Sequence, residues 1–303
     1  MYALKRILRA LPVLWGTSTL VFFLIHFIPG DPVDIILGEN ALPANREQLR
    51  EQLGLNLPVV TQYKNFMLGL FQFDLGESIY KNRPVIDIIL EKLPSTALLA
   101  VLAMCFSVAL SIPLGILAAI RRGSWTDHLN MIVSLIGLAM PTFWLGPLLV
   151  IYFSIGLGWF PVSEFTDWRS CVLPTVTLGV ALAAIVTRMT RSAVLEQLDQ
   201  DFVRTARSKG LTETFVLGKH VLRNALIPVV TIIGLQTGAL LSGAIITETV
   251  FDWPGVGLLI FQGIQSRDYP LVQGCVLVIS TTYILVNLAT DIVYGIIDPR
   301  IRY

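Results

Sequence analysis

Long apolar stretches separated by shorter polar segments make up most of this chain. A helix that crosses a bilayer needs roughly 20 mostly apolar residues, and six stretches have about that length. They cover residues 7–28, 96–120, 129–155, 173–189, 229–250 and 271–297. The pattern predicts an all-α polytopic membrane protein with six transmembrane helices.

The polar segment between the first and second predicted spans, residues 29–93, is too long for a simple turn. Its apolar positions recur at helical spacing. They predict short helices over residues 46–53, 59–71 and 85–90, with Gly54 ending the first. A partly helical segment of this kind either packs over the helix bundle or contacts a soluble partner outside the membrane.

Residues 199–228 form the longest polar run between two strongly apolar spans, and this run is markedly basic. Asp199 is a candidate N-cap for a helix that reaches Ser208, and Gly210 can end it in the left-handed conformation. A second short helix fits residues 212–221, with Thr212 as N-cap, before Pro228 opens the next span. The segment therefore predicts a helix–glycine–helix elbow between two spans.

The basic residues near the span ends predict the orientation in the membrane, because cytoplasmic loops carry an excess of Lys and Arg. With the amino terminus inside, 14 of the 22 Lys and Arg residues fall on the cytoplasmic side. Six of the other eight lie within residues 29–93, where charge counts less because long loops cross largely regardless of it. Both termini are therefore predicted to be cytoplasmic.

Composition agrees with a membrane protein and excludes several other classes. The chain is 54% hydrophobic and 14% charged, whereas about 25% of residues are charged in a typical soluble domain. A net charge of +1 with dispersed basic residues gives no patch for nucleic acid. The widely separated cysteines and histidines have no metal-ligand spacing, so no metal site is predicted. They are Cys105, Cys171, Cys275, His26, His128 and His220.

The chain has no phosphate-binding loop of its own. Such a loop needs Gly-Lys followed by Ser or Thr, and here the pair Gly218-Lys219 continues with His220. If ATP drives this membrane protein, the hydrolysing site belongs to another chain.

The elbow resembles the cytoplasmic coupling loop of permease subunits in ATP-binding-cassette (ABC) importers. Ala206, Gly210 and Pro228 stand where that loop has its alanine, its glycine and its later proline. In that family the loop rests in a groove on the ATPase subunit and passes its motion into the membrane.

Departures from the general loop are similar to the peptide and nickel permease branch. Arg204 and Thr205 replace the usual Glu and Ala, and Arg223 stands where many members have an earlier proline. Other motifs of that branch are FDLGESI (residues 73–79), MPTFWLG (140–146), ETVFDWPGVG (248–257) and RDYPLVQG (267–274). The resemblance covers almost the whole chain.

The resemblance implies a type I ABC importer permease fold in the bacterial inner membrane. Residues 1–93 would hold the first span and the external segment, 94–297 the transmembrane core, and 298–303 a cytoplasmic tail. The implied partners are a second homologous permease, two ATPase subunits, an extracytoplasmic substrate-binding protein and membrane lipid. ATP and Mg²⁺ would bind to the ATPase subunits, so this chain would be neither an enzyme nor a cofactor binder. The residues implied to dock on the ATPase are Arg204, Thr205, Ala206, Arg207, Lys209, Gly210, Leu211 and Phe215.

Polar side chains within the fifth predicted span mark a candidate translocation pathway. They are Gln236, Thr237, Ser242, Thr247 and Glu248. Glycines lie among them, and small residues let helices approach closely, so close packing is the alternative interpretation. By resemblance, the next turn, with Trp253, Pro254 and Gly255, folds back toward the channel mouth as an external gate loop.

Short peptides are the cargo that the resemblance favours, with glutathione or chelated nickel as alternatives. A protein of another class, an ion-coupled secondary transporter, would need paired carboxylates near mid-membrane, and Asp291 is the only deep one. A membrane scaffold that transports nothing is the remaining alternative. Copurification of an ATPase subunit separates these hypotheses.

Overall fold

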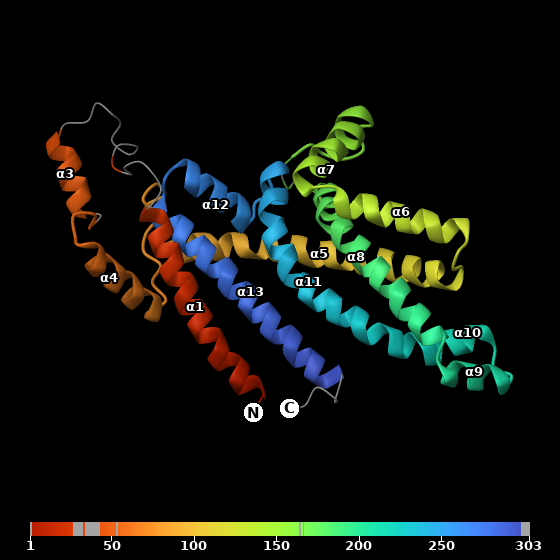
Figure 1. Ribbon diagram of the computed structural model, residues 1–303. Coiled ribbons are helices and arrows are strands. Elements are labelled where there is room, and N and C mark those ends of the chain that lie inside the picture. Colours follow the sequence, from red (N-terminus) through yellow and green to blue (C-terminus); the bar gives the residue numbers. More distant parts are fainter. Residues whose placement is uncertain are drawn as a thin grey trace. The chain divides into compact units, whose positions relative to one another are not determined.

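The computed structural model describes residues 2–26, 33, 43–52, 54–163, 165 and 167–297, which form mainly helices joined by turns (Figure 1). The α-helices are α1 (Tyr2–His26), α3 (Pro43–Gln52), α4 (Val59–Phe71), α5 (Val85–Ile120), α6 (Trp125–Ala139), α7 (Thr142–Leu149), α8 (Val172–Leu198), α9 (Asp201–Ser208), α10 (Glu213–Phe215), α11 (Leu222–Val250), α12 (Val256–Gln265) and α13 (Tyr269–Ile297). Two π-helical stretches follow α7 (Val150–Gly156) and α10 (Val216–Val221), and a 3₁₀ turn (Trp168–Cys171) precedes α8. The predicted tail, residues 298–303, lies outside the described residues.

The chain divides into two compact units. The first contains residues 3–96 and 254–284, and the second contains 97–253 together with the segment from 285 onward. The candidate coupling segment and all five candidate pathway residues belong to the second unit.

The all-α polytopic membrane class is confirmed. Among the described residues, four helical stretches are long and apolar enough to cross a membrane, covering 85–120, 168–198, 213–240 and 269–290. Helix α6 and the α7 stretch after it pass the same test together, which gives up to five crossings. A shorter apolar helix covers 10–23 in α1. The count of six transmembrane helices stays a prediction.

Helix α5 differs from the prediction at its start. A separate short helix over 85–90 was predicted before the second span, but one helix of 36 residues runs from Val85 to Ile120. At 1.5 Å per residue it is about 54 Å long, which exceeds the roughly 30 Å hydrocarbon core. The charged residues Glu91 and Lys92 and the following Pro94 therefore lie within a continuous helix instead of marking a boundary.

The third predicted span is sharply bent. Helix α6 ends at Ala139 and α7 begins at Thr142, with a 105° bend between the two helical stretches. Pro141, in extended conformation at ψ 141°, is the N-cap of α7. Proline has no N–H to donate and crowds the preceding turn, so it ends one helix and starts another here. A proline thus interrupts the third predicted span.

Helix α8 is the most buried element of the second unit. Its neighbours approach it at three glycines, where a Cβ atom would meet other atoms at short range. On α5, a Cβ at Gly115 would lie 2.6 Å from Cβ of Thr190. On α6, a Cβ at Gly137 would lie 3.0 Å from Cγ1 of Val180. A Cβ at Gly179 of α8 itself would lie 3.0 Å from the Ala103 carbonyl oxygen of α5.

In the first unit, the predicted helix over 59–71 is confirmed as α4, and the one over 46–53 corresponds to α3. Gly54, after α3, has φ +66°. The segment after α4 is tied to the turn before α13 by the buried carboxylate of Asp268. This carboxylate accepts hydrogen bonds from the hydroxyl of Ser78 and from backbone N–H groups of Ile79 and Tyr80.

Candidate functional site

The elbow has the predicted helix–glycine–helix form. Helix α9 ends at Ser208, and Gly210 has φ +77°, a left-handed conformation that favours glycine. Thr212, extended at ψ 146°, is the N-cap of α10 as predicted. Helices α9 and α10 lie together beyond the end of α8 (Figure 1).

Two boundaries of the elbow were predicted wrongly. Asp199 ends α8 instead of starting α9, and the N-cap of α9 is Gln200, which is extended at ψ 150°. Pro228 lies inside α11 instead of opening it, because the α10 helix continues through the π-helical residues 216–221 into α11. The elbow is therefore joined to both flanking spans by continuous or nearly continuous helix.

One face of the elbow belongs to the core of the second unit. Val203, Ala206, Val216 and Val221 are at most 5% exposed and pack in the same apolar cluster as α8 residues such as Val194. The other predicted docking residues are exposed, and they are Arg204, Thr205, Arg207, Lys209, Gly210, Leu211 and Phe215. Ala206 alone of the predicted set is buried, so its small side chain serves packing.

The exposed face of the elbow carries ordered charge. Arg207 pairs with Glu213 across the glycine turn, with Nε–Oε1 at 2.7 Å and Nη2–Oε2 at 3.2 Å. The ammonium of Lys219 lies 5.1 Å from the centre of the Phe215 ring, within the range of a cation–π contact. The surface thus presents basic and aromatic groups on a defined backbone.

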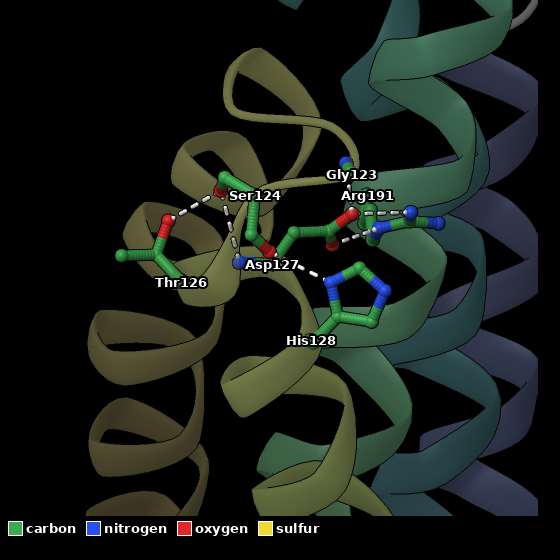
Figure 2. A network of polar contacts seen from close by, with 6 residues as sticks. All are labelled: Gly123, Ser124, Thr126, Asp127, His128 and Arg191. Atoms are coloured by element: carbon green, nitrogen blue, oxygen red, sulfur yellow. Dashed lines mark hydrogen bonds and ion pairs between the residues drawn. The ribbon is translucent and has the colours of Figure 1, made fainter.

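A second polar cluster lies at the turn between α5 and α6 (Figure 2). The carboxylate of Asp127 is held by the guanidinium of Arg191 on α8, with Nε–Oδ1 at 2.6 Å and Nη2–Oδ2 at 2.8 Å. The N–H of Gly123 donates to the same carboxylate at 2.9 Å. Sequence reasoning missed Asp127. Within this chain Arg191 is paired with Asp127.

The predicted pathway residues occupy different environments along α11. Gln236 and Thr237 are half-buried, and the Thr237 hydroxyl donates to the Ile233 carbonyl at 2.9 Å. Thr247 and Glu248 are fully buried within this chain. Eleven residues make roughly three helical turns, so Thr237 and Glu248 lie on nearly the same side of α11. The side chain of Ser242 lies outside the described ones, and the pathway stays a prediction.

The predicted external gate loop begins with a buried aromatic residue. Trp253 is 1% exposed, its N–H donates to the Glu248 carbonyl at 2.8 Å, and its ring lies edge-on to Phe165 with centroids 5.0 Å apart. Pro254 is half-buried, and the buried Gly255 is the N-cap of α12. The turn is thus anchored from Trp253, and its role as a gate stays a prediction.

Within the described part of the chain, no group of three or more His, Cys, Asp or Glu side chains is placed to hold a metal ion.

Two family models match the chain. The model described as "Binding-protein-dependent transport system inner membrane component" matches residues 111–303. The model for the amino-terminal part of the same class of membrane component matches residues 1–100.

Curated relatives match over the full length of the chain. The glutathione transport system permease protein GsiC of Escherichia coli (strain K12) is 43% identical, over 100% of this chain and 99% of that protein. The dipeptide transport system permease protein DppB of Alkalihalophilus pseudofirmus is 42% identical with the same coverage. Among solved structures, an inward-facing MetNI methionine ABC transporter matches with a TM-score of 0.59 and 17% identity, over 70% of this chain and 97% of the matched chain. This match supports the type I importer fold that the resemblance implied.

Proposed function

The chain belongs to the family of binding-protein-dependent transport system inner membrane components, and we propose that it is one permease subunit of an ATP-driven importer for short peptides. It is a multi-pass inner-membrane protein that takes part in transport and is not an enzyme. In the proposed complex it pairs with a second homologous permease, two ATPase subunits and an extracytoplasmic substrate-binding protein. ATP and Mg²⁺ bind at the ATPase subunits, and both termini of this chain are cytoplasmic.

The observation that carries the proposal is the elbow around Gly210. Its apolar side is fixed in the core through Val203 and Val216, which are both fully buried. Its other side presents exposed basic residues and Phe215 to the outside of the chain. A surface that is rigidly attached to two long helices and open to a partner suits the transfer of motion from a soluble subunit into the membrane.

In the proposed mechanism, closure of the ATPase subunits pushes the elbow, and α8 and α11 carry the displacement into the membrane. The candidate pathway residues of α11 then face one side of the membrane or the other as the helices rotate against the second permease. Among these residues, the Glu248 side chain is fully buried by the rest of this chain. The anchored turn at Trp253 directly follows this helix, which suits a gate that moves with it.

The substrate class rests on relatives named for glutathione and for dipeptides. Both are short peptides with a free carboxylate and amine, so a short peptide is the cargo common to the two. Glutathione is the specific alternative, because the relative at 43% identity is named for it. In such a complex the external binding protein contributes much of the choice among these cargoes.

Reconstitution of the complex tests this function. The chain, tagged and purified from its native membrane, is expected to bring down an ATPase subunit in stoichiometric amount. In proteoliposomes with the binding protein, uptake of labelled dipeptide and glutathione should require ATP and persist when an ionophore collapses the proton gradient. A chain that purifies alone and takes up peptide only with a proton gradient would refute the proposal.

A further inference from the structure

We propose that the ion pair between Asp127 and Arg191 is a latch that makes α6 move with α8 when the elbow is displaced. This inference rests on the proposed importer function and assigns a positioning role to two residues outside the elbow. Both belong to the second unit, and they are 64 residues apart in the sequence.

The pair has the geometry of a firm joint. Both carboxylate oxygens of Asp127 accept from the Arg191 guanidinium, and Oδ2 also accepts from the N–H of Gly123 (Figure 2). Two parallel N–H···O bonds fix direction as well as distance. The Asp127 side chain is 4% exposed, so water screens the attraction less than it screens a surface pair. Loss of either partner leaves the other charge poorly compensated in a buried site.

The latch lies close to the elbow along α8. Arg191 is seven residues before the end of this helix at Leu198, a distance of about 10 Å along the axis. Helix α9 begins only three residues later, and its buried residue Val203 shares an apolar cluster with Val194 of α8. A push on α9 therefore reaches the Arg191 turn through packed side chains and continuous backbone.

The latch adds a polar joint to the apolar packing of α6 on α8. That packing includes the close contact of Gly137 with Val180, where a Cβ atom on the glycine would lie 3.0 Å from Cγ1 of the valine. Asp127 is ten residues before Gly137, or about 15 Å along α6. Apolar packing has little directional preference, whereas a two-point ion pair at this separation fixes how the two helices are aligned. With the ion pair closed, α6 and α8 form one rigid body.

Beyond α6, the same body reaches the end of the candidate pathway. Helix α6 leads through the 105° bend into α7. There Gly146 lies against the last residue of α11, since a Cβ on it would be 3.0 Å from Cγ1 of Val250. Thr247 and Glu248 are in that last turn of α11, and Trp253 follows it. With the latch in place, a displacement of the elbow can pass through α8, α6 and α7 to the end of α11 that precedes the candidate gate.

A double-mutant cycle in the reconstituted complex tests the latch. The variants are Asp127→Asn, Arg191→Gln and the two combined, with Arg122→Gln as the matched control, since Arg122 is an exposed arginine of the same turn. Peptide uptake per ATP hydrolysed is measured, together with the amount of ATPase subunit that copurifies and the melting temperature of the complex.

Each single variant should assemble and hydrolyse ATP, with uptake per ATP lowered by about fivefold or more, the lower end of typical coupling between sites. The combined variant should be no worse than the singles, because both remove one interaction. Arg122→Gln should match the wild type. Unchanged uptake per ATP in the singles, additive losses, or failure of the variants to assemble would each overturn the latch. A failed proposed function is recognised separately, because the wild-type complex itself would then lack ATP-driven uptake.

Discussion

Arg207 and Glu213 form a two-point ion pair across the turn at Gly210, with Nε–Oε1 at 2.7 Å and Nη2–Oε2 at 3.2 Å. The side chains are 43% and 61% exposed, and such pairs add only about 0–1 kcal/mol to stability. Their effect is geometric, because they join the end of α9 to the start of α10. Together with the left-handed glycine, the pair sets the angle of the elbow that the ATPase would meet.

Replacing Gly210 by alanine should change the elbow through backbone conformation alone. Gly210 has φ +77°, and a Cβ there would meet nothing within 4 Å. The left-handed conformation costs an L-residue roughly 1–2 kcal/mol, so the turn should shift to relieve it. We expect lower ATP-coupled uptake, measured in proteoliposomes, with normal amounts of the complex.

The matched control is Gly218→Ala in the helix that follows. A Cβ at Gly218 also meets nothing within 4 Å, but its φ lies outside the left-handed region. Alanine there should leave uptake unchanged and raise stability by about 0.5–1 kcal/mol, the gain usual in a helix. Equal uptake by the two variants would contradict a special role for the conformation at Gly210.

Neutralising either partner of the Arg207–Glu213 pair should reduce coupling more than stability. Arg207→Gln and Glu213→Gln should each lower ATP-coupled uptake, while the free energy of unfolding changes by less than about 1 kcal/mol. The exchanged pair, Arg207→Glu with Glu213→Arg, should restore part of the uptake. If Arg207 acts instead by binding the ATPase directly, Glu213→Gln will be silent and the exchange will not rescue.

Local patterns predicted those parts of the fold that depend on neighbouring residues. Helix α4 begins and ends where apolar spacing placed it, after Pro58. Gly54 and Gly210 have positive φ, as expected where a helix ends at a glycine. In contrast, α5 runs from Val85 to Ile120 through Pro94 as one helix. The charged residues and the proline near position 94 locally mark a helix boundary, so the local pattern was misleading there. The third predicted span was read as one apolar stretch, and the 105° bend at Pro141 depends on packing that no local pattern contains.

The polar clusters could not be predicted because their partners are distant in sequence. Asp127 and Arg191 are 64 residues apart, and Asp268 and Ser78 are 190 apart. Each of these residues, read locally, is an ordinary polar group near a span end. In the elbow, the exposed basic side was predicted, whereas the burial of Ala206 required knowledge of how α9 packs on the core.

Replacing Asp268 by asparagine should loosen the segment after α4. The carboxylate accepts from the Ser78 hydroxyl and from the N–H groups of Ile79, Tyr80 and Leu271, the last at 3.2 Å. An amide group cannot accept at both positions, so buried donors lose partners at about 1–3 kcal/mol. We expect a lower melting temperature and new proteolytic cuts within residues 72–84, mapped by mass spectrometry.

Asp74→Asn is the control for that change, because Asp74 is exposed and its carboxylate accepts from the N–H of Gly76 at 2.8 Å. This variant should leave the melting temperature and the cutting pattern close to the wild type. Similar behaviour of the two variants would mean that the bonds to Asp268 do not hold the segment.

Replacing Gly115 by alanine should separate α5 from α8. The new Cβ would lie 2.6 Å from Cβ of Thr190 and 2.7 Å from the Thr187 carbonyl oxygen. A Cβ atom and a backbone oxygen are fixed by the main chain of α8, so neither can move away by a change of rotamer. Overpacking of this kind costs about 1–3 kcal/mol. The melting temperature of the purified complex should therefore fall.

Gly16→Ala in α1 provides the opposite case, because a Cβ there meets nothing within 4 Å. Alanine should stabilise that helix by about 0.5–1 kcal/mol relative to glycine, so the two variants are expected to shift the melting temperature in opposite directions. The difference comes from contact with α8 alone, since both replacements add the same methyl group to a helix. A Gly115→Ala complex as stable as the wild type would mean that α5 and α8 do not approach this closely, and the packing that holds α8 at the centre of the second unit would have to be different.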